Sequence, residues 1–335
     1  MDRVTILVTG GAGFIGSCFI HSLRKTRPDY SIINVDKLTY AGDLRNLEGI
    51  EEGKNYHFVR GDITNRELMR YLFSAFRPRY VVNFAAESHV DRSIAGPEIF
   101  VHTNVLGTQV LLEAFRDYVG QGSHEARFLQ VSTDEVYGAL PLESEERFSE
   151  NSPLRPNSPY AASKAAADLL VRSYWVTYRL PVLITRSSNN FGPRQYPEKL
   201  IPLMITHALE GQPLPVYGDG QNVRDWLYVE ENCRAIDMVL HRGKPGEIYN
   251  IGGRNEWRNI DLVRLLCDLL AEETKREAEE YRKLITFVPD RPGHDRRYAL
   301  NTEKIYRELG FQAQENFREA LRHTVRWYIE RHGKV

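Results

Sequence analysis

The stretch VTGGAGFIG, Val8–Gly16, follows a short apolar run and opens a helical pattern. Its glycines Gly10, Gly13 and Gly16 permit a tight turn and a close approach of the backbone to a pyrophosphate. The helix after such a turn offers free N–H groups and the positive end of its dipole. We therefore predict a dinucleotide-binding strand–turn–helix unit here, with a plain glycine turn as the alternative.

The residue that selects the dinucleotide is predicted at the end of the second strand. Asp36 stands there, 20 residues after Gly16 (36 − 16). A carboxylate in this position accepts hydrogen bonds from a ribose 2′-OH and repels a 2′-phosphate, so we predict NAD rather than NADP. The adjacent Lys37 weakens that discrimination, and a helix-capping aspartate is the alternative. Further cofactor contacts are predicted at Phe14, Ile15, Asp62, Ile63, Ala85 and Ala86.

Short runs rich in Val, Ile and Phe alternate with helix-length segments through the first half of the chain. This alternation is typical of a parallel sheet covered by helices on both faces, so the predicted class is α/β, a Rossmann-type doubly wound sheet. The predicted strands span residues 5–8, 32–35, 57–60, 81–84, 128–132 and 182–186. The predicted helices span residues 13–26, 66–76, 103–118 and 159–178.

The pattern changes after residue 186. Residues 189–202 are rich in Asn, Pro and Gly and are predicted to form a loop. We predict a cofactor-binding domain over residues 1–186, with returns near 223–260, and a smaller, interleaved α/β substrate domain over 187–335. The expected elements of this half are helices at 201–210, 229–241, 262–283, 302–309 and 317–331, a short strand within 211–221 and a strand at 248–251.

Composition narrows the classes of partner and location. The 335 residues carry a net charge of −1, 42% hydrophobic and 27% charged residues, and no basic block. Binding to nucleic acid or a membrane surface is therefore not expected. No apolar run is long enough for a membrane span, and the N-terminus shows no signal-peptide pattern. The cysteines Cys18, Cys233 and Cys267 lack metal-ligand spacing, so free thiols, no metal site and a cytoplasmic location are expected.

Tyr160 and Lys164 lie four residues apart in SPYAASKAAADLL, which places both side chains on one helical face. A nearby ammonium stabilises a phenolate, so we predict that Lys164 lowers the pKa of Tyr160 toward working pH. Such a pair can take a proton from a sugar hydroxyl as hydride leaves the same carbon. Thr133, on the strand between this helix and the glycine loop, would orient that hydroxyl. A surface Tyr and Lys on an alanine-rich helix is the alternative.

Two adjacent carboxyls follow the apolar run RFLQVS in VSTDEVYG, Val131–Gly138. Asp134 and Glu135 are costly to hold near apolar surroundings unless the chemistry uses them. Like groups placed side by side push their pKa values apart, which suits a paired acid and base. The alternative is that both carboxyls cap the next turn.

These stretches together resemble a known family. TGGAGFIG, Asp36 and YAASK are similar to the extended short-chain dehydrogenase/reductase superfamily that acts on nucleotide sugars. AAESHVDRSI, STDEVYG and SSNNFGPRQYPEKLIPL narrow the resemblance to the dTDP-glucose 4,6-dehydratases, from Val4 to about Tyr328. In related epimerases the Asp-Glu pair after the strand threonine is absent.

The resemblance implies a complete reaction with bound NAD. Tyr160 takes the O4 proton while the C4 hydride passes to NAD; Glu135 then removes the C5 proton, and Asp134 protonates the departing C6 hydroxyl. Hydride returns to C6, which leaves a 4-keto-6-deoxy sugar. The residues implied to hold the nucleotide sugar are His89, Asn190, Glu198, Lys199, Leu200, Pro215, Tyr217, Arg224, Asn259, Arg291 and His294.

The resemblance leaves some points open. Asn301 and Phe191 stand where the family often has aspartate and tyrosine. The nucleotide is dTDP or, as the alternative, UDP or another; a 4-epimerase, a decarboxylase and a non-catalytic NAD-sensing scaffold are further alternatives. For Asn259 a helix N-cap is the competing interpretation, and for each arginine a solvated surface charge. The helices at 103–118 and 159–178 carry apolar residues on more than one face, which predicts a homodimer through a four-helix bundle.

Overall fold

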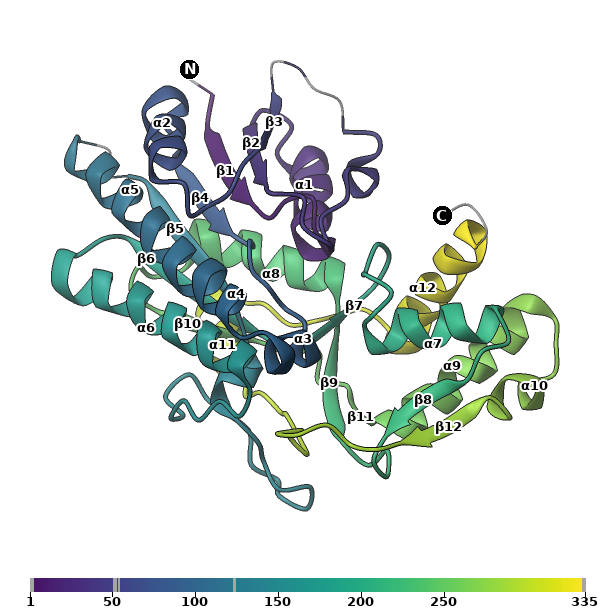
Figure 1. Cartoon of the computed structure of the whole chain (residues 1–335). Coiled ribbons are helices and arrows are strands. Elements are labelled where there is room, and N and C mark those ends of the chain that lie inside the picture. Colours follow the sequence, from purple (N-terminus) through teal and green to yellow (C-terminus); the bar gives the residue numbers. More distant parts are fainter. Residues whose placement is uncertain (1–2, 51–52, 54, 123–124, 333–335) are drawn as a thin grey trace.

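A seven-stranded parallel sheet forms the centre of the computed structural model, which describes residues 3–50, 53, 55–122 and 125–332 (Figure 1). The strand order is β10-β6-β5-β4-β1-β2-β3, so the predicted doubly wound α/β class is confirmed. The ends of the two predicted domain ranges, residues 1–2 and 333–335, lie outside the described residues. The strands are β1 (Thr5–Thr9), β2 (Ser31–Asp36), β3 (Tyr56–Arg60), β4 (Tyr80–Asn83), β5 (Arg127–Thr133), β6 (Val182–Ser187) and β10 (Ile248–Ile251).

Helices cover both faces of the sheet because successive strand residues point to opposite sides. Ile6 and Val8 of β1 join one buried cluster, while Leu7 between them joins a second. The first cluster includes residues of α1 (Phe14–Thr26) and α8 (Val229–Arg242). The second includes residues of α2 (Arg66–Phe76), α5 (Thr108–Gly120) and α6 (Pro159–Tyr178). Because helices bury both faces of these strands, the strand sequences are almost continuously apolar.

Two of these helices begin where the sequence supplies a cap. The Asn65 side chain accepts a hydrogen bond from the Leu68 N–H at the start of α2. Ser158 accepts from the Ala161 N–H at the start of α6, and Pro159 occupies the first helical position. The predicted bounds of both helices, 66–76 and 159–178, are confirmed.

The segment before α5 departs from the prediction. A helix was expected from residue 103, but the chain forms α3 (Val90–Ala95), the short α4 (Glu98–Phe100) and then a π-helix, η2 (Val101–Gly107), which continues into α5. A π-helix accommodates an inserted residue by an i→i+5 pattern and carries no residue signature of its own. The sequence therefore predicted a helix here without its true start or its irregular turn.

The smaller part of the fold follows β6 and contains two small sheets, β11-β9-β7 and β12-β8. The predicted loop at 189–202 contains a strand and the first turn of a helix. The predicted helix at 262–283 is divided, because Lys275 adopts φ of +59° and ends its first part. The bounds are β7 (Asn189–Phe191), α7 (Leu200–Leu209), β8 (Leu214–Tyr217), β9 (Val223–Tyr228), β11 (Glu256–Arg258), α9 (Asn259–Thr274), α10 (Ala278–Arg282), β12 (Ile285–Val288), α11 (Glu303–Leu309) and α12 (Phe317–Arg331).

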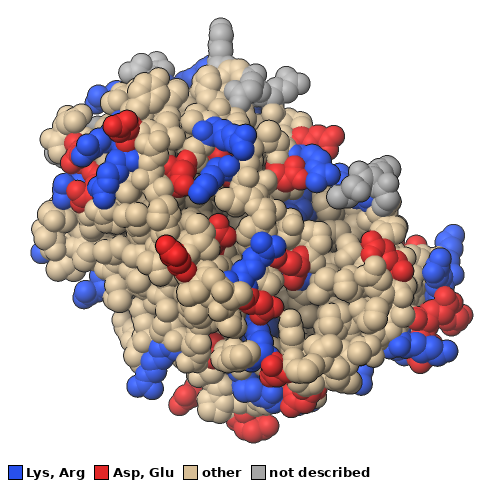
Figure 2. All heavy atoms as spheres, in the orientation of Figure 1, with Lys and Arg blue, Asp and Glu red and all other residues tan. Residues whose placement is uncertain are grey.

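The surface carries both signs of charge. Basic and acidic side chains are intermixed on the face shown in Figure 2. Within the described part of the chain, no helix combines the length and the apolar character that crossing a bilayer requires. The smaller part of the fold, with α7, α9 and α12, lies beside the carboxyl end of the central sheet (Figure 1).

Candidate active site

A cavity of about 300 Å³ opens at the carboxyl ends of the central strands. β1 and β4 are neighbours there although they are far apart in sequence, and the chain leaves them toward opposite ends of the sheet. Such a switch point leaves a crevice between two diverging loops, where α/β proteins bind ligands. The loops after β1 to β6 all contribute to the lining.

The glycine loop fits a pyrophosphate. Gly10 has φ of +71°, and a Cβ there would lie 2.6 Å from the Ala85 backbone N. A Cβ on Gly16 would lie 2.2 Å from the carbonyl O of Gly10. Gly13 is the N-cap of α1 and supplies no capping side chain, so the first N–H groups of that helix remain available to an anion. These observations support the predicted role of the loop.

Asp36 ties the glycine loop to β2. Its carboxylate accepts from the Ala12 N–H at 2.9 Å and from the Leu38 N–H at 2.8 Å. Asp36 lines the cavity with acceptor capacity left over, since a carboxylate offers about four lone-pair positions. Lys37, which weakened the NAD prediction, forms an ion pair with Asp62 at 2.8 Å. The carboxylate of Asp62 therefore neutralises the charge of Lys37 beside the predicted cofactor site.

The two adjacent carboxyls both line this cavity. They begin a 3₁₀ turn, η3 (Asp134–Tyr137), whose N-cap is Thr133; its hydroxyl accepts from the Glu135 N–H at 3.3 Å. The cap is therefore the threonine, and the alternative capping role of the carboxyls is wrong. Asp134 is 1% exposed, and its Oδ2 has no hydrogen-bond partner among the described residues.

Neighbouring charges act differently on the pKa values of these two carboxyls, while burial raises both. Burial raises the pKa of Asp134 well above its usual range, and the charges of Glu135 and Asp225 raise it further. Burial also raises the pKa of Glu135, but the charges of Arg291, Lys199 and Arg224 oppose that rise. Asp134 therefore favours the protonated form more strongly than Glu135 does, as a proton donor beside a base requires.

Tyr160 and Lys164 lie on α6, buried on the wall of the same cavity. Burial raises the pKa of Tyr160 well above 10, and the charge of Glu135 raises it further. This direction is opposite to our prediction, because desolvation of the phenolate outweighs any help from the lysine. Burial lowers the pKa of Lys164 to about 8. The Lys164 ammonium donates to the carbonyl of Val131 at 2.7 Å.

Three predicted substrate residues, Asn190, Glu198 and Lys199, also line the cavity. The Lys199 ammonium donates to the carbonyl of Ser88 at 2.8 Å, and burial lowers its pKa. His89 approaches Glu198 at 3.8 Å. Burial lowers the pKa of His89, so its neutral form is favoured.

Arg291 and Tyr217 meet at one carboxylate, Asp91, just outside this lining. Asp91 accepts from the Arg291 guanidinium at 3.2 Å and from the Tyr217 hydroxyl at 3.2 Å. The Arg291 Nε atom is buried without a hydrogen-bond partner among the described residues. A donor left unpaired in this way is suited to a ligand oxygen.

Arg224 is buried and donates to the carbonyls of Val223 and Asp295, so the alternative of a solvated surface charge is wrong for it. The alternative of an N-cap at Asn259 is also wrong, since the N-cap of α9 is Arg258. The predicted substrate residues outside the cavity lining are His89, Leu200, Pro215, Tyr217, Arg224, Asn259, Arg291 and His294.

Comparison with known proteins identifies the family. The family described as GDP-mannose 4,6 dehydratase matches residues 7–324. A probable dTDP-glucose 4,6-dehydratase of Sinorhizobium fredii is 53% identical over 329 residues, which is 97% of this chain and 93% of that protein. The dTDP-glucose 4,6-dehydratase 1 of Escherichia coli is 51% identical over 335 residues, 97% of this chain and 92% of that protein. The chain belongs to the dTDP-glucose 4,6-dehydratase family.

A solved structure supports the same placement. The dTDP-glucose 4,6-dehydratase of Streptomyces venezuelae, determined with NAD and dTDP bound, has a TM-score of 0.90 and 46% identity to this chain. The match covers 99% of this chain and 98% of that one. The resemblance drawn from the sequence motifs is confirmed.

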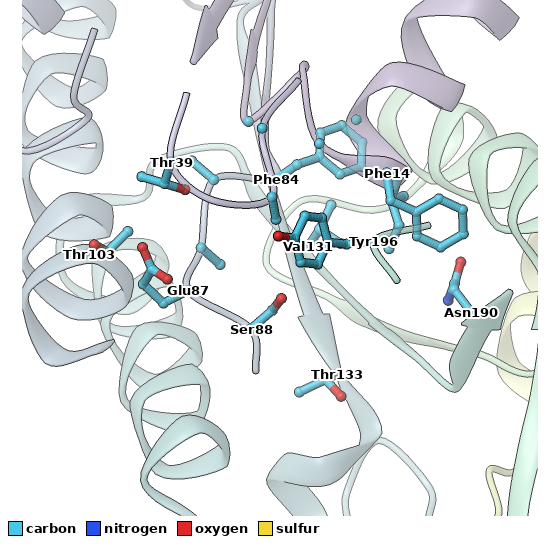
Figure 3. A pocket seen from close by; sticks show the side chains of 18 of the residues that line it. Phe14, Thr39, Phe84, Glu87, Ser88, Thr103, Val131, Thr133, Asn190 and Tyr196 are labelled. Atoms are coloured by element: carbon cyan, nitrogen blue, oxygen red, sulfur yellow. The ribbon is translucent and has the colours of Figure 1, made fainter. Parts of the chain in front are cut away.

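Sequence reasoning missed several residues that line the cavity. Figure 3 shows Thr133 at the end of β5, with Glu87 and Ser88 to one side and Asn190 to the other. Most of the missed residues lie in loops without a recognisable pattern, and only the order of the strand ends could have indicated them. The missed residues include Val35, Thr39, Ala41, Gly42, Ser88, Thr103, Val131, Ser187, Ser188, Asn189, Gln195 and Tyr196.

Proposed function

We propose that this chain converts dTDP-glucose into dTDP-4-keto-6-deoxyglucose and water, using an NAD that is regenerated in each cycle. The observation that carries the proposal is the carboxyl pair Asp134 and Glu135, the first buried and the second partly buried, which lines the same cavity as Tyr160, Lys164 and the glycine loop. Bound NAD supplies a hydride acceptor and, once reduced, the hydride donor. Simple inversion at C4 would need no acid at C6.

The first proposed step is oxidation at C4, in which Tyr160 is the base. The Tyr160 phenolate takes the O4 proton, with the Thr133 hydroxyl orienting the substrate oxygen. The Lys164 ammonium, charged below its pKa of about 8, favours that phenolate against the burial that opposes it. The oxidised C4 then acidifies the C5–H.

The two carboxyls complete the elimination. Glu135 takes the C5 proton and later returns it to C5, while protonated Asp134 gives its proton to the C6 oxygen, which leaves as water. Over the cycle, the proton gained at Tyr160 balances the one that Asp134 gives up. The raised pKa of Asp134 keeps its donor form available at neutral pH.

The cationic residues of the second half are proposed to bind the nucleotide diphosphate. Arg291, with its unpaired Nε, and buried Arg224 both stand close enough to lower the pKa of Glu135 through their charges. Guanidinium groups match phosphate oxygens well. Pro215, Tyr217 and Asn259 are proposed to contact the base.

Product analysis tests the proposal. The purified chain is incubated separately with dTDP-glucose, UDP-glucose and GDP-mannose, and the alkali-induced absorbance of a 4-keto sugar is measured. We expect product from dTDP-glucose and about 5- to 150-fold less efficient turnover of UDP-glucose, since the thymine methyl is worth about 1–3 kcal/mol. If none of the three donors gives a keto sugar, the proposed dehydratase reaction is wrong. If UDP-glucose is the better substrate, the nucleotide is UDP and not dTDP.

We also propose that the chain is a homodimer in the cytoplasm. Large apolar side chains are exposed along η2 and α6, including Val101 and Leu169, each 55% exposed. Helices with a second apolar face suit a four-helix bundle between two copies. The three cysteines are free and buried, as a reducing compartment allows.

A further inference from the structure

A buried carboxylate that the proposed reaction does not use lies one helical turn beyond Lys164. Asp168 of α6 is 1% exposed, and its Oδ2 accepts from the Arg186 Nε at 2.8 Å. Its Oδ1 has no hydrogen-bond partner among the described residues. Burying a carboxylate with one oxygen unpaired costs free energy of folding, which suggests that this carboxylate has a function.

The partner of Asp168 belongs to a network that reaches the catalytic turn. Arg186 of β6 donates to the Tyr137 hydroxyl at 2.9 Å, and its guanidinium lies 4.8 Å from the centre of that ring. The Tyr137 hydroxyl in turn donates to Asn250 Oδ1 at 2.7 Å. Tyr137 ends the same η3 turn that begins with Asp134. The network therefore ties α6 to the element that carries the two carboxyls.

Asp168 is also the carboxylate that acts on Lys164. Side chains four residues apart on a helix are neighbours, and both of these are buried. Burial lowers the pKa of Lys164 to about 8, and the charge of Asp168 opposes that fall. A lysine without such a partner would lose its proton at a still lower pH.

The other charged or titratable groups near Lys164 come from several elements. Tyr160 shares its helix, Asp134 and Glu135 stand on η3, and Arg186 stands on β6. The charges of α5 face the far end of α6, where Glu113 accepts from the Tyr174 hydroxyl. The exposed His102 lies on η2, and Glu87, Asp91 and Arg92 lie on or beside α3. None of these supplies the opposing charge that Asp168 does.

We infer that Asp168 is a positioning residue of the reaction, whose carboxylate keeps the Lys164 ammonium charged while Tyr160 exchanges its proton with the substrate. The inference rests on the proposed function, because it assigns Asp168 a part in that chemistry through Lys164. Arg186 holds the carboxylate in place, and the network through Tyr137 keeps α6 in register with η3.

The pH profile of the Asp168→Asn variant tests this inference. Loss of the carboxylate is expected to move the alkaline limb of kcat down by about one pH unit, the usual effect of a close opposite charge. Turnover of dTDP-glucose should then fall about fivefold at pH 8 and little at pH 6. Asp168→Glu, which keeps the charge, should restore most of the wild-type limb. An unchanged limb in folded Asp168→Asn holoenzyme would overturn the inference.

A double variant separates this role from a structural one. Asp168→Asn leaves Arg186 buried and unpaired, which alone can destabilise the fold. Asp168→Asn with Arg186→Gln removes both charges, so the fold no longer holds a lone buried ion. If Asp168 acts on Lys164, the alkaline limb remains shifted in the double variant; return of the wild-type limb would show that Asp168 serves only to neutralise Arg186. Wild-type turnover is measured first, and its absence would defeat the proposed function itself.

Discussion

At position 135 a carboxyl meets two opposing influences. Burial raises the pKa of Glu135, while the charges of Arg291, Lys199 and Arg224 lower it and so favour the ionised form. Two of these cations are also proposed to hold the substrate diphosphate. The ionised base and the bound diphosphate therefore share counter-charges, so the position of the substrate and the protonation of Glu135 are coupled.

Glu135→Gln should retain NAD and substrate but lose turnover by about 10²- to 10⁴-fold, the usual contribution of a general base. C4 oxidation does not require this base, so nicotinamide absorbance near 340 nm should rise after dTDP-glucose is added and then persist. Glu145→Gln, at an exposed position, is the matched control and should behave as wild type. Unchanged turnover in Glu135→Gln would defeat the assigned role.

Asp134→Asn should stabilise the fold increasingly as the pH rises. The folded pKa of Asp134 is raised, so between the unfolded value near 4 and the folded value the native state binds more protons than the unfolded state. Wild-type stability attributable to this group is full below about pH 4 and is lost as the pH rises through the folded pKa. Thermal unfolding of both proteins at pH 4.5, 6 and 8, with matched NAD content, measures the difference; parallel curves would contradict it.

At the residue scale the sequence predicted which side chains share the cavity better than it predicted their pKa values. The motif residues Thr133, Asp134, Glu135, Tyr160 and Lys164 do share one cavity. The sign of the Tyr160 pKa shift was wrong, because burial depends on packing from distant segments that spacing does not reveal. Loop residues such as Tyr196 carry no pattern that points to the cavity.

The glycine loop is the element whose geometry tolerates least change. A Cβ at Gly16 would lie 2.2 Å from one backbone atom and 2.8 Å from another, so the loop itself must move. Gly16→Ala should therefore lose at least about tenfold in NAD affinity while leaving the distant core intact. Fluorescence titration with NAD and circular dichroism measure both effects. Gly120→Ala, with no neighbour within 4 Å, is the control, and equal affinity in both variants would refute this account.

Element bounds were predictable where local chemistry marks them. Asn65 and Ser158 accept hydrogen bonds at the starts of α2 and α6, and both predicted ranges agree with the structure. The end of α9 was not predictable, because Lys275 adopts a left-handed conformation that glycine would ordinarily signal. The strands β7, β9, β11 and β12 were missed. For β7, β11 and β12 the reason is length, since three or four residues cannot establish an alternating pattern.

At the scale of the whole molecule, the exposed apolar residues on η2 and α6 predict an interface. Leu169→Glu places a charge where a second copy would bury it, so the variant should sediment as a monomer at micromolar concentration, whereas the wild type sediments as a dimer. Tyr71→Glu, at a 61% exposed residue of α2, is the control and should remain dimeric. A monomeric wild-type chain would contradict the prediction.

The sheet also draws on both halves of the chain. β10 pairs with β6 at one end of the sheet, although 60 residues separate Ser187 from Ile248 (248 − 187 − 1). α8, from the same later region, covers one face. The predicted domain division places returns of the chain to the cofactor-binding domain near residues 223–260.

The late arrival of β10 has a consequence during synthesis on the ribosome. Six strands can align once β6 has emerged, but the β6 edge stays open until Ile251 follows. An unpaired strand edge is a template for association between chains. At a translation speed of about 5–20 residues per second, the nascent protein carries that edge for several seconds. On crowded polysomes, neighbouring nascent chains can therefore misassemble through this edge during that interval, which slow codons between β6 and β10 would lengthen.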